Sequence, residues 1–164
     1  MALNDVKIVS GAYKVQKFQV AAGAVGSIKA GEPVKKTGVG SPYVILLADG
    51  DPEYGTDIFI GIAMNTSTDT AGADGTVDVA IVVPGITVMR CKATTAANVD
   101  TQAEIDALVG DTVSMDLTST TFTIDENEGD DDNVHGFIIL GGDPIAKTLD
   151  FVAKGGMHLS ASIL

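Results

Sequence analysis

The side chains best suited to nucleophilic or acid–base chemistry are few in this sequence. It holds two histidines, His135 and His158, and one cysteine, Cys91. Nucleophilic catalysis requires a base within reach of an activated Ser, Thr or Cys, but neither histidine belongs to a triad-like motif and no G-x-S-x-G turn occurs. Cys91 follows Arg90 in a strand-like segment, where a buried structural thiol is expected rather than a reactive thiolate. We therefore predict that the protein is not an enzyme and has no catalytic residues.

Ligand sets for a metal ion or a phosphate group are equally sparse. Zinc is not indicated, because there is no second cysteine and the two histidines lack ligand spacing. The glycine turns at 23–26 and 38–40 lack the lysine or the dinucleotide fingerprint of a phosphate-binding loop. The acidic run 125–132 (DENEGDDD) offers oxygen ligands for calcium, but it has no acidic ligand at its end and no flanking helices of an EF-hand. We expect a solvated, self-repelling loop there, no bound metal and no cofactor.

Charge is distributed unevenly along the chain. The formal net charge is −12, yet residues 1–36 carry 6 − 2 = +4, which leaves 4 − 20 = −16 for the remainder. An acidic body of this kind argues against nucleic acid as a partner. The basic N-terminal third is predicted to face different surroundings, although its lysines also fit a merely solubilised arm. These lysines are Lys7, Lys14, Lys17, Lys29, Lys35 and Lys36.

Features that the sequence lacks indicate the compartment in which the protein is made. No apolar run reaches the length of a membrane span, and residues 1–11 lack the basic and apolar regions of a signal peptide. A single cysteine excludes an intrachain disulfide framework. We expect a soluble protein made in a reducing compartment, with no membrane partner.

The composition and the local patterns predict an all-β fold. Gly is abundant, Trp is absent and aromatic residues make up 5%, so the core must consist of small aliphatic side chains carried by many short strands. The central segment Asp78–Cys91 alternates with period two on both sides of Pro84-Gly85, which predicts two strand segments joined by a tight turn or a sharp bend. Further strands are expected within 15–20, 43–47, 58–63, 113–117, 121–124, 135–140 and 149–152.

One short helix is expected at Thr101–Val109. Thr101 and Glu104 form a capping-box pattern, and Gly110 is suited to a left-handed stop. Residues 1–15 show little periodicity and are predicted to form an N-terminal arm that is ordered only when docked. Residues 16–164 are then predicted to form a single β domain.

An internal repeat relates two halves of this domain, about 28–92 and 107–160. The matches, in the same order in both halves, are Gly31–Val34 with Gly110–Val113, Tyr43–Ile45 with Phe122–Ile124, Gly61-Ile62 with Gly136-Phe137, and Ala80–Val83 with Phe151–Lys154. The first two pairs share an offset of 79 positions. Half-units of this size cannot bury a sheet face alone, so they are expected to close on one core as a compact antiparallel barrel or sandwich.

These features resemble one known family. The loop Ala30–Val34 (AGEPV), the strand end Gly61-Ile62-Ala63 and the strand interrupted at Gly85 within Val79–Val88 are similar to the capsid decoration (cement) proteins of tailed bacteriophages, including those with the β-tulip fold. The resemblance covers roughly residues 18–160. It implies a non-enzymatic protein on the outer surface of the icosahedral head, commonly a homotrimer at local threefold positions, with an N-terminal arm that contacts the major capsid protein. The helix at 101–109 and the acidic loop at 125–132 depart from the family pattern and leave the oligomeric state open.

The resemblance also suggests which residues make contacts. An extended arm can add a strand to a neighbouring sheet, so Val6, Ile8 and Val9 are predicted to dock while Lys7, Lys14 and Lys17 meet an acidic capsid surface. Arg90 and Lys92 are the only basic residues between Lys36 and Lys147. They are predicted to pair with an acidic loop or a neighbouring subunit. The protein is expected in the virion, after synthesis in the host cytoplasm.

Two other functions remain open on the sequence. A carbohydrate-binding head appendage or adhesin-like β-module needs exposed aromatic platforms, and the chain offers only Tyr13, Tyr43 and Tyr54 with no Trp. A small barrel enzyme acting on nucleotides is the other alternative.

Overall fold

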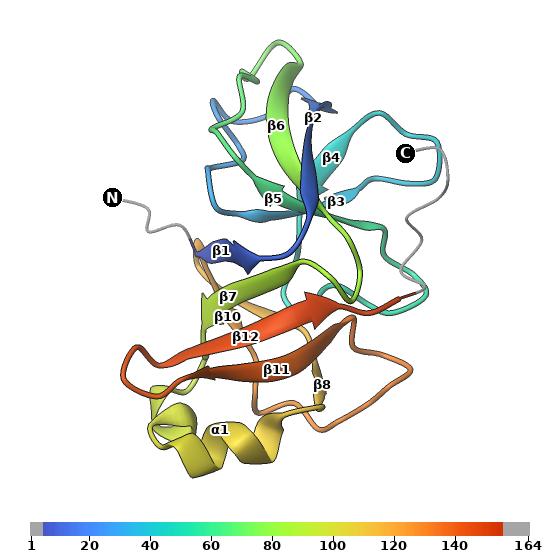
Figure 1. Cartoon of the computed structure of the whole chain (residues 1–164). Helices are drawn as coiled ribbons and strands as arrows, with labels where there is room; N and C mark the ends of the chain where they lie inside the picture. Colours follow the sequence, from blue (N-terminus) through green and yellow to red (C-terminus); the bar gives the residue numbers. More distant parts are fainter. Residues whose placement is uncertain (1–4, 156–164) are drawn as a thin grey trace.

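The computed structural model describes residues 5–155, and it shows a mainly antiparallel all-β fold with one short α-helix (Figure 1). The predicted fold class is therefore confirmed, and the sheets stay open rather than closing into barrels. Within residues 5–155, neither helical segment has the length and apolar character needed to cross a bilayer.

Two five-stranded sheets and a separate hairpin make up the fold. The strand order of the first sheet is β2 (Tyr13–Val20), β6 (Gly75–Val82), β5 (Phe59–Ala63), β3 (Pro33–Lys36) and β4 (Val44–Leu46). The order of the second is β1 (Val6–Ser10), β7 (Val88–Lys92), β12 (Thr148–Ala153), β11 (Phe137–Asp143) and β8 (Thr112–Val113). The hairpin consists of β9 (Met115–Thr118) and β10 (Thr121–Ile124).

The helical part lies between β7 and β8. A 3₁₀ turn, η1 (Ala96–Val99), precedes α1 (Gln102–Leu108). Both hydrogen bonds of the predicted capping box are present, between Thr101 and Glu104, and Gly110 takes a positive φ of 97° after the helix. Ile105 is fully buried, so the helix packs its one apolar stripe against the second sheet.

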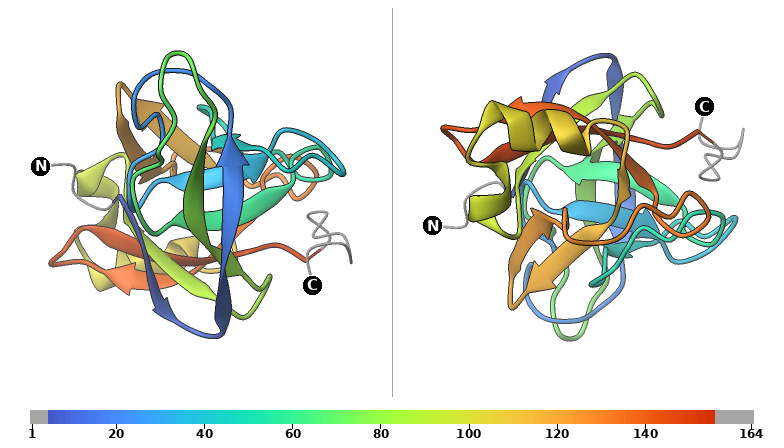
Figure 2. Two further views of the ribbon diagram at one scale, coloured as in Figure 1. Left: turned by 90° about the horizontal axis from the view of Figure 1, so that it is seen from above. Right: turned by 90° about the horizontal axis from the view of Figure 1, so that it is seen from below.

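The central segment Asp78–Cys91 forms two strands, as predicted, but they belong to different sheets. β6 lies in the first sheet and β7 in the second, so the bend at Pro84-Gly85 carries the chain from one sheet to the other (Figure 2). The chain from β1 to β2 makes the same crossing, and the two bends touch. A Cβ atom on Gly11 would lie 2.1 Å from the Ile86 carbonyl oxygen, so only glycine fits this crossing.

The predicted N-terminal arm is wrong for residues 6–15. β1 pairs with β7, and β2 pairs with β6 over all eight of its residues, so these segments belong to the two sheets of this chain. The short run β1 carries only a weak alternation, and its partner lies about eighty residues away, which is why local pattern did not reveal the pairing. Residues 1–4 lie outside the described part of the chain.

The two halves show the same succession of strand pairs. β2, β6, β5 and β3 pair in the first sheet in the order in which β7, β12, β11 and β8 pair in the second. The first half therefore runs from β2 to β6 and the second from β7 to β12, so the predicted bounds 28–92 and 107–160 place β7 in the wrong half. The turn before β3 and the turn before β8 also match: the Gly31 amide donates to the Ala63 carbonyl (2.8 Å), and the Gly110 amide donates to the Ile139 carbonyl (2.9 Å). The offset of 79 positions between Gly31 and Gly110 therefore aligns equivalent positions.

Other matches shift by one residue. Val34 faces Gly61 across the first sheet, and Val113 faces Phe137 across the second, so Gly61 is equivalent to Phe137 and not to Gly136. By the same pairing, Val79 opposite Ala63 is equivalent to Phe151 opposite Ile139.

Two clusters of buried side chains form the core. One lies within the first half, around Phe18, Val34 and Ile60. The other fills the second half and extends into the first, where the Phe59 ring packs edge-on against Phe137 with centroids 5.1 Å apart. Phe137 in turn lies 4.9 Å from Phe151. Aromatic contacts thus join the two halves.

Candidate functional site

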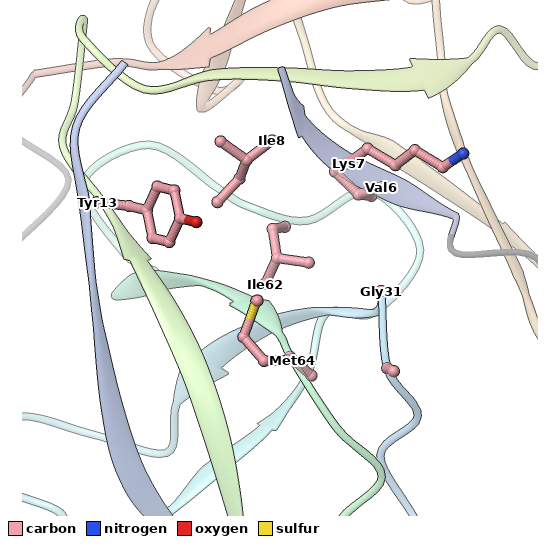
Figure 3. A pocket seen from close by; sticks show the side chains of 9 residues that line it. Val6, Lys7, Ile8, Tyr13, Gly31, Ile62 and Met64 are labelled. Carbon is pink, nitrogen blue, oxygen red and sulfur yellow. The ribbon is translucent and has the colours of Figure 1, made fainter. Parts of the chain in front are cut away.

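Three of the predicted contact residues line one groove. Val6, Lys7 and Ile8 of β1 face β2 and β5 across a groove of about 300 Å³ (Figure 3). Its remaining lining residues are Tyr13, Ala30, Gly31, Ile62, Ala63 and Met64. We call this the β1 groove. It is assembled from three segments that are distant in the sequence.

The groove runs along an open sheet edge. β1 is the outermost strand of its sheet, and at one end its Val6 amide donates to the Gly31 carbonyl (3.0 Å) on the side away from β7. Alternate residues of a strand direct their backbone groups to the same side. The amide and carbonyl of Ile8 therefore point into the groove, where they offer pairing groups to an added strand.

The floor and walls of the groove are apolar. Ile62 is buried in the floor, while Tyr13 and Met64 stay 48% and 49% exposed on the walls. Figure 3 shows the side chains of Tyr13, Ile8, Ile62 and Met64 converging, whereas the Lys7 amino group points outward along the rim. This arrangement suits an apolar segment whose ends carry negative charge.

The structure does not bring the other predicted contact residues into the groove. Val9 lies at the irregularity of β1 between Ile8 and Ser10, with 43% of its surface exposed. Lys14 neighbours Tyr13 on β2, so its side chain points to the opposite face of that strand. Lys17 faces Asp78 in the β2–β6 register and borders a separate shallow hollow.

Arg90 and Lys92 lie on β7, on the outer face of the second sheet. Arg90 donates two hydrogen bonds to Asp150 of β12, at 2.6 and 2.8 Å, and this carboxylate raises the pKa of Arg90. The ion pair that we predicted for Arg90 thus exists within the chain, with a strand residue and not with the acidic loop. Lys92 instead borders a second hollow together with Lys7 and Arg90.

The acidic loop is bound to the fold by alternate carboxylates. Glu126 accepts from the Thr94 and Thr95 amides, both at 2.9 Å. Glu128 accepts from the Ser114 amide and hydroxyl, and Asp130 accepts from the Thr112 amide and hydroxyl. At Thr112, the Asp130 carboxylate replaces a backbone partner that the edge strand β8 lacks.

The predicted solvated, self-repelling loop is therefore wrong for these inward-facing acids. The hydrogen bonds from Thr112 hold the pKa of Asp130 below its ordinary value. In residues 5–155, no group of three or more His, Cys, Asp or Glu side chains is placed to hold a metal ion.

Cys91 and His135, two of the groups considered for chemistry, are buried and contact groups of the fold. Cys91 is buried, its thiol donates to the Phe122 carbonyl (3.3 Å), and burial raises its pKa to about 12. The Nε2 atom of His135 lies 3.1 Å from the Gly129 carbonyl oxygen, and its Nδ1 atom lies 3.2 Å from a Glu128 oxygen. His158 lies outside the described residues.

Sequence reasoning missed most of the groove. Local pattern gives Tyr13, Ile62 and Met64 no role beyond strand or aromatic character, because nothing local shows that β1 and β5 meet. The exposure of Tyr13 and Val15 on β2, both about half exposed, marks a strand face that the chain itself leaves uncovered.

Comparisons with protein-family models, with curated proteins and with solved structures found no match to this chain.

Proposed function

We propose that this protein is a non-enzymatic decoration protein of a tailed-bacteriophage capsid. It binds the outer surface of the icosahedral head in the virion and stabilises contacts between subunits of the major capsid protein. The observation that carries this proposal is the β1 groove, an open strand edge beside an apolar surface. It supports binding to an extended protein segment.

Binding by strand addition needs these two features together. Backbone hydrogen bonds to the edge supply affinity, and apolar side chains at alternate positions set the register. The Ile8 backbone supplies the hydrogen-bonding groups, and the Tyr13, Ile62 and Met64 side chains supply the apolar contacts. Lys7 on the rim favours a capsid segment with acidic flanks.

The charge distribution supports the orientation on the head. The basic residues gather within 1–36 of the sequence and Lys7 lies on the groove rim, so the groove side faces the capsid. Lys14 and Lys17, the other predicted capsid lysines, lie outside the groove. The acidic remainder faces solvent, where like charge keeps decorated particles apart. Neither nucleic acid nor a membrane is needed as a partner. From the family resemblance, we propose that the protein binds the head as a homotrimer.

A charge placed on the groove wall tests the proposal. Met64→Glu puts a carboxylate into the apolar wall, and we expect the variant to lose co-sedimentation with heads that lack the protein. Ile145→Glu is the matched control, because Ile145 is 92% exposed and outside the groove. If M64E and I145E bind heads equally well, the groove is not the capsid site.

Truncation is a poorer test in this fold. Deleting residues 2–14 removes β1 and the start of β2, and with them the pairing to β7 and β6. Loss of binding by such a variant reports unfolding as readily as loss of a contact. The point substitution at Met64 keeps both ladders.

A carbohydrate-binding module is the second candidate, favoured by the exposed Tyr13 ring in the groove. The other tyrosines are less available: the Tyr43 hydroxyl donates to Asp74 (2.6 Å), and Lys154 lies over the Tyr54 ring. One aromatic platform is a poor supply for a sugar site. Binding on a glycan array that Tyr13→Ala abolishes supports this alternative.

A further inference from the structure

A second hollow lies on the other side of β1 from the groove floor. It has a volume of about 310 Å³ and opens between β1, β7 and the β9–β10 hairpin. Three of its lining residues are cations, Lys7, Arg90 and Lys92. Its other lining residues are Asp5, Cys91, Thr121, Phe122, Thr123, Ala146 and Thr148. We call it the basic hollow.

The basic hollow keeps positive charge that the chain does not neutralise. Lys7 faces Arg90 directly in the β1–β7 register, and Lys92 lies two positions further on the same face. Arg90 is paired with Asp150, but among residues 5–155 neither Lys7 nor Lys92 has an ion-pair partner.

One acid, Asp5, also lines the hollow. Its carboxylate accepts from the Phe122 amide (3.1 Å), and burial raises its pKa. Two unpaired lysines beside a single engaged carboxylate leave a positive site on a protein whose net charge is −12.

The acidic partner for this site lies at the opposite end of the same sheet. Asp131 and Asp132 are exposed at the tip of the acidic loop, whereas the Asp130 carboxylate accepts from Thr112. Asp132 lies 3.1 Å from the amino group of Lys154, just after β12 ends. The basic hollow contains Thr148, where β12 begins. Six strand residues separate the two ends by about 20 Å, and Figure 1 shows the loop and the start of β1 on opposite sides.

The loop cannot reach the hollow of its own chain. The hydrogen bonds from Thr112 to Asp130 and from Ser114 to Glu128 fix it at the far end of the sheet. A complementary partner that this protein itself supplies is therefore the acidic tip of another copy.

We propose that the basic hollow of one subunit binds Asp131 and Asp132, the acidic tip of a second copy, head to tail. Because the two patches differ, the contact is heterologous, and such contacts generate a closed ring when the rotation between subunits closes. Closure at three subunits rests on the proposed function, whereas the contact itself rests on the charges. Of the two residues predicted to contact a neighbouring subunit, this contact uses Lys92, whereas Arg90 is held by Asp150. It adds Lys7, which was predicted to contact the capsid.

Charge reversal with mixing tests the contact in the full-length protein. The wild type is expected to have a mass of about 50 kDa by light scattering after size exclusion, three times the 16.8 kDa chain. The double variants K7E/K92E and D131K/D132K are each expected to fall to the monomer mass, because like charges then meet. Mixed in equal amounts, they are expected to recover the oligomer, since each supplies the patch that the other has lost.

The control is K14E/K17E, which makes the same change in net charge on exposed lysines outside the hollow. It should keep the wild-type mass. A wild type that is monomeric at every concentration, or an oligomer that survives both reversals, overturns the proposal, and so does a mixture of folded variants that stays monomeric. Capsid binding is measured separately by co-sedimentation. A monomer that binds heads therefore overturns only this contact, and an oligomer that ignores heads overturns only the proposed function.

Discussion

Phe137 is the residue whose loss should show whether the two halves unfold as one unit. Its ring is fully buried between Phe59 of the first half and Phe151 of the second, at centroid distances of 5.1 and 4.9 Å. Phe137→Ala removes a fully buried aromatic side chain, and such changes cost about 3–5 kcal/mol when the site cannot collapse. The two ring contacts, worth about 0.5–1.5 kcal/mol each, place the expected loss in the upper part of that range.

The assay is urea unfolding followed by two probes. Far-UV circular dichroism reports on the whole fold. Tyrosine fluorescence reports on the first half and its border with the second, because Tyr13, Tyr43 and Tyr54 all precede β6 and Lys154 lies over the Tyr54 ring. For a slope of about 2 kcal/mol per molar urea, a loss of about 4 kcal/mol lowers the midpoint by about 2 M. If the halves form one cooperative unit, both probes should shift together.

Leu140→Ala is the control on the same strand, since Leu140 is 47% exposed and its loss should change the stability by less than about 0.5 kcal/mol. Tyrosine fluorescence that keeps the wild-type midpoint in F137A, while dichroism falls early, would refute the reasoning. A loss below about 1 kcal/mol in F137A would refute it too, because the ring would then not join the halves.

Two further predictions concern acid stability and a close backbone approach. Hydrogen bonds from Thr112 lower the folded-state pKa of Asp130 below its ordinary 3.8, so the loop contributes stability above that pH and loses it as the pH falls through the folded pKa. Asp130→Asn should therefore narrow the difference in urea midpoint between neutral pH and about pH 3; an unchanged difference contradicts this. A Cβ on Gly75 would lie 2.0 Å from the Asp69 amide nitrogen, whereas Gly72 has open space around it. Gly75→Ala should destabilise by about 2 kcal/mol or more in thermal unfolding and Gly72→Ala by less than about 0.5 kcal/mol; equal melting temperatures count against so close an approach of the two backbone segments.

Local pattern predicted the elements whose stability is local or whose alternation is strong. The capping box at Thr101 and Glu104 needs only its own backbone, and the apolar run of β5 is buried in any sheet arrangement. The two strands on either side of Pro84-Gly85 were predicted for the same reason. Their assignment to different sheets was not, because a bend and a hairpin turn carry the same residues.

The features that sequence reasoning missed all depend on contacts between distant segments. β1 is stabilised by a strand about eighty residues later, and the β1 groove exists only because β1, Gly31 and β5 meet. The acidic run predicts a solvated loop because six acids in eight residues normally repel one another. Edge amides at Thr112 and Ser114 donate hydrogen bonds to these carboxylates, and their need for partners is visible only once β8 is known to be short.

The repeated strand order indicates that the β1 groove is the position of a further strand beside β1. β6 leads into the bend before β7 and is flanked by β2 and β5; β12, its equivalent, is flanked by β7 and β11. β1 resembles β6 and β12 in that it also leads into a bend, the one before β2. In the described chain, however, β1 has a strand, β7, on one side only, and the groove lies on its other side. A strand of another protein placed there would occupy the position that β5 holds beside β6. The apolar walls at Tyr13 and Met64 are then the surface that such a strand covers, which is why a charge at position 64 should act on binding and leave the fold intact.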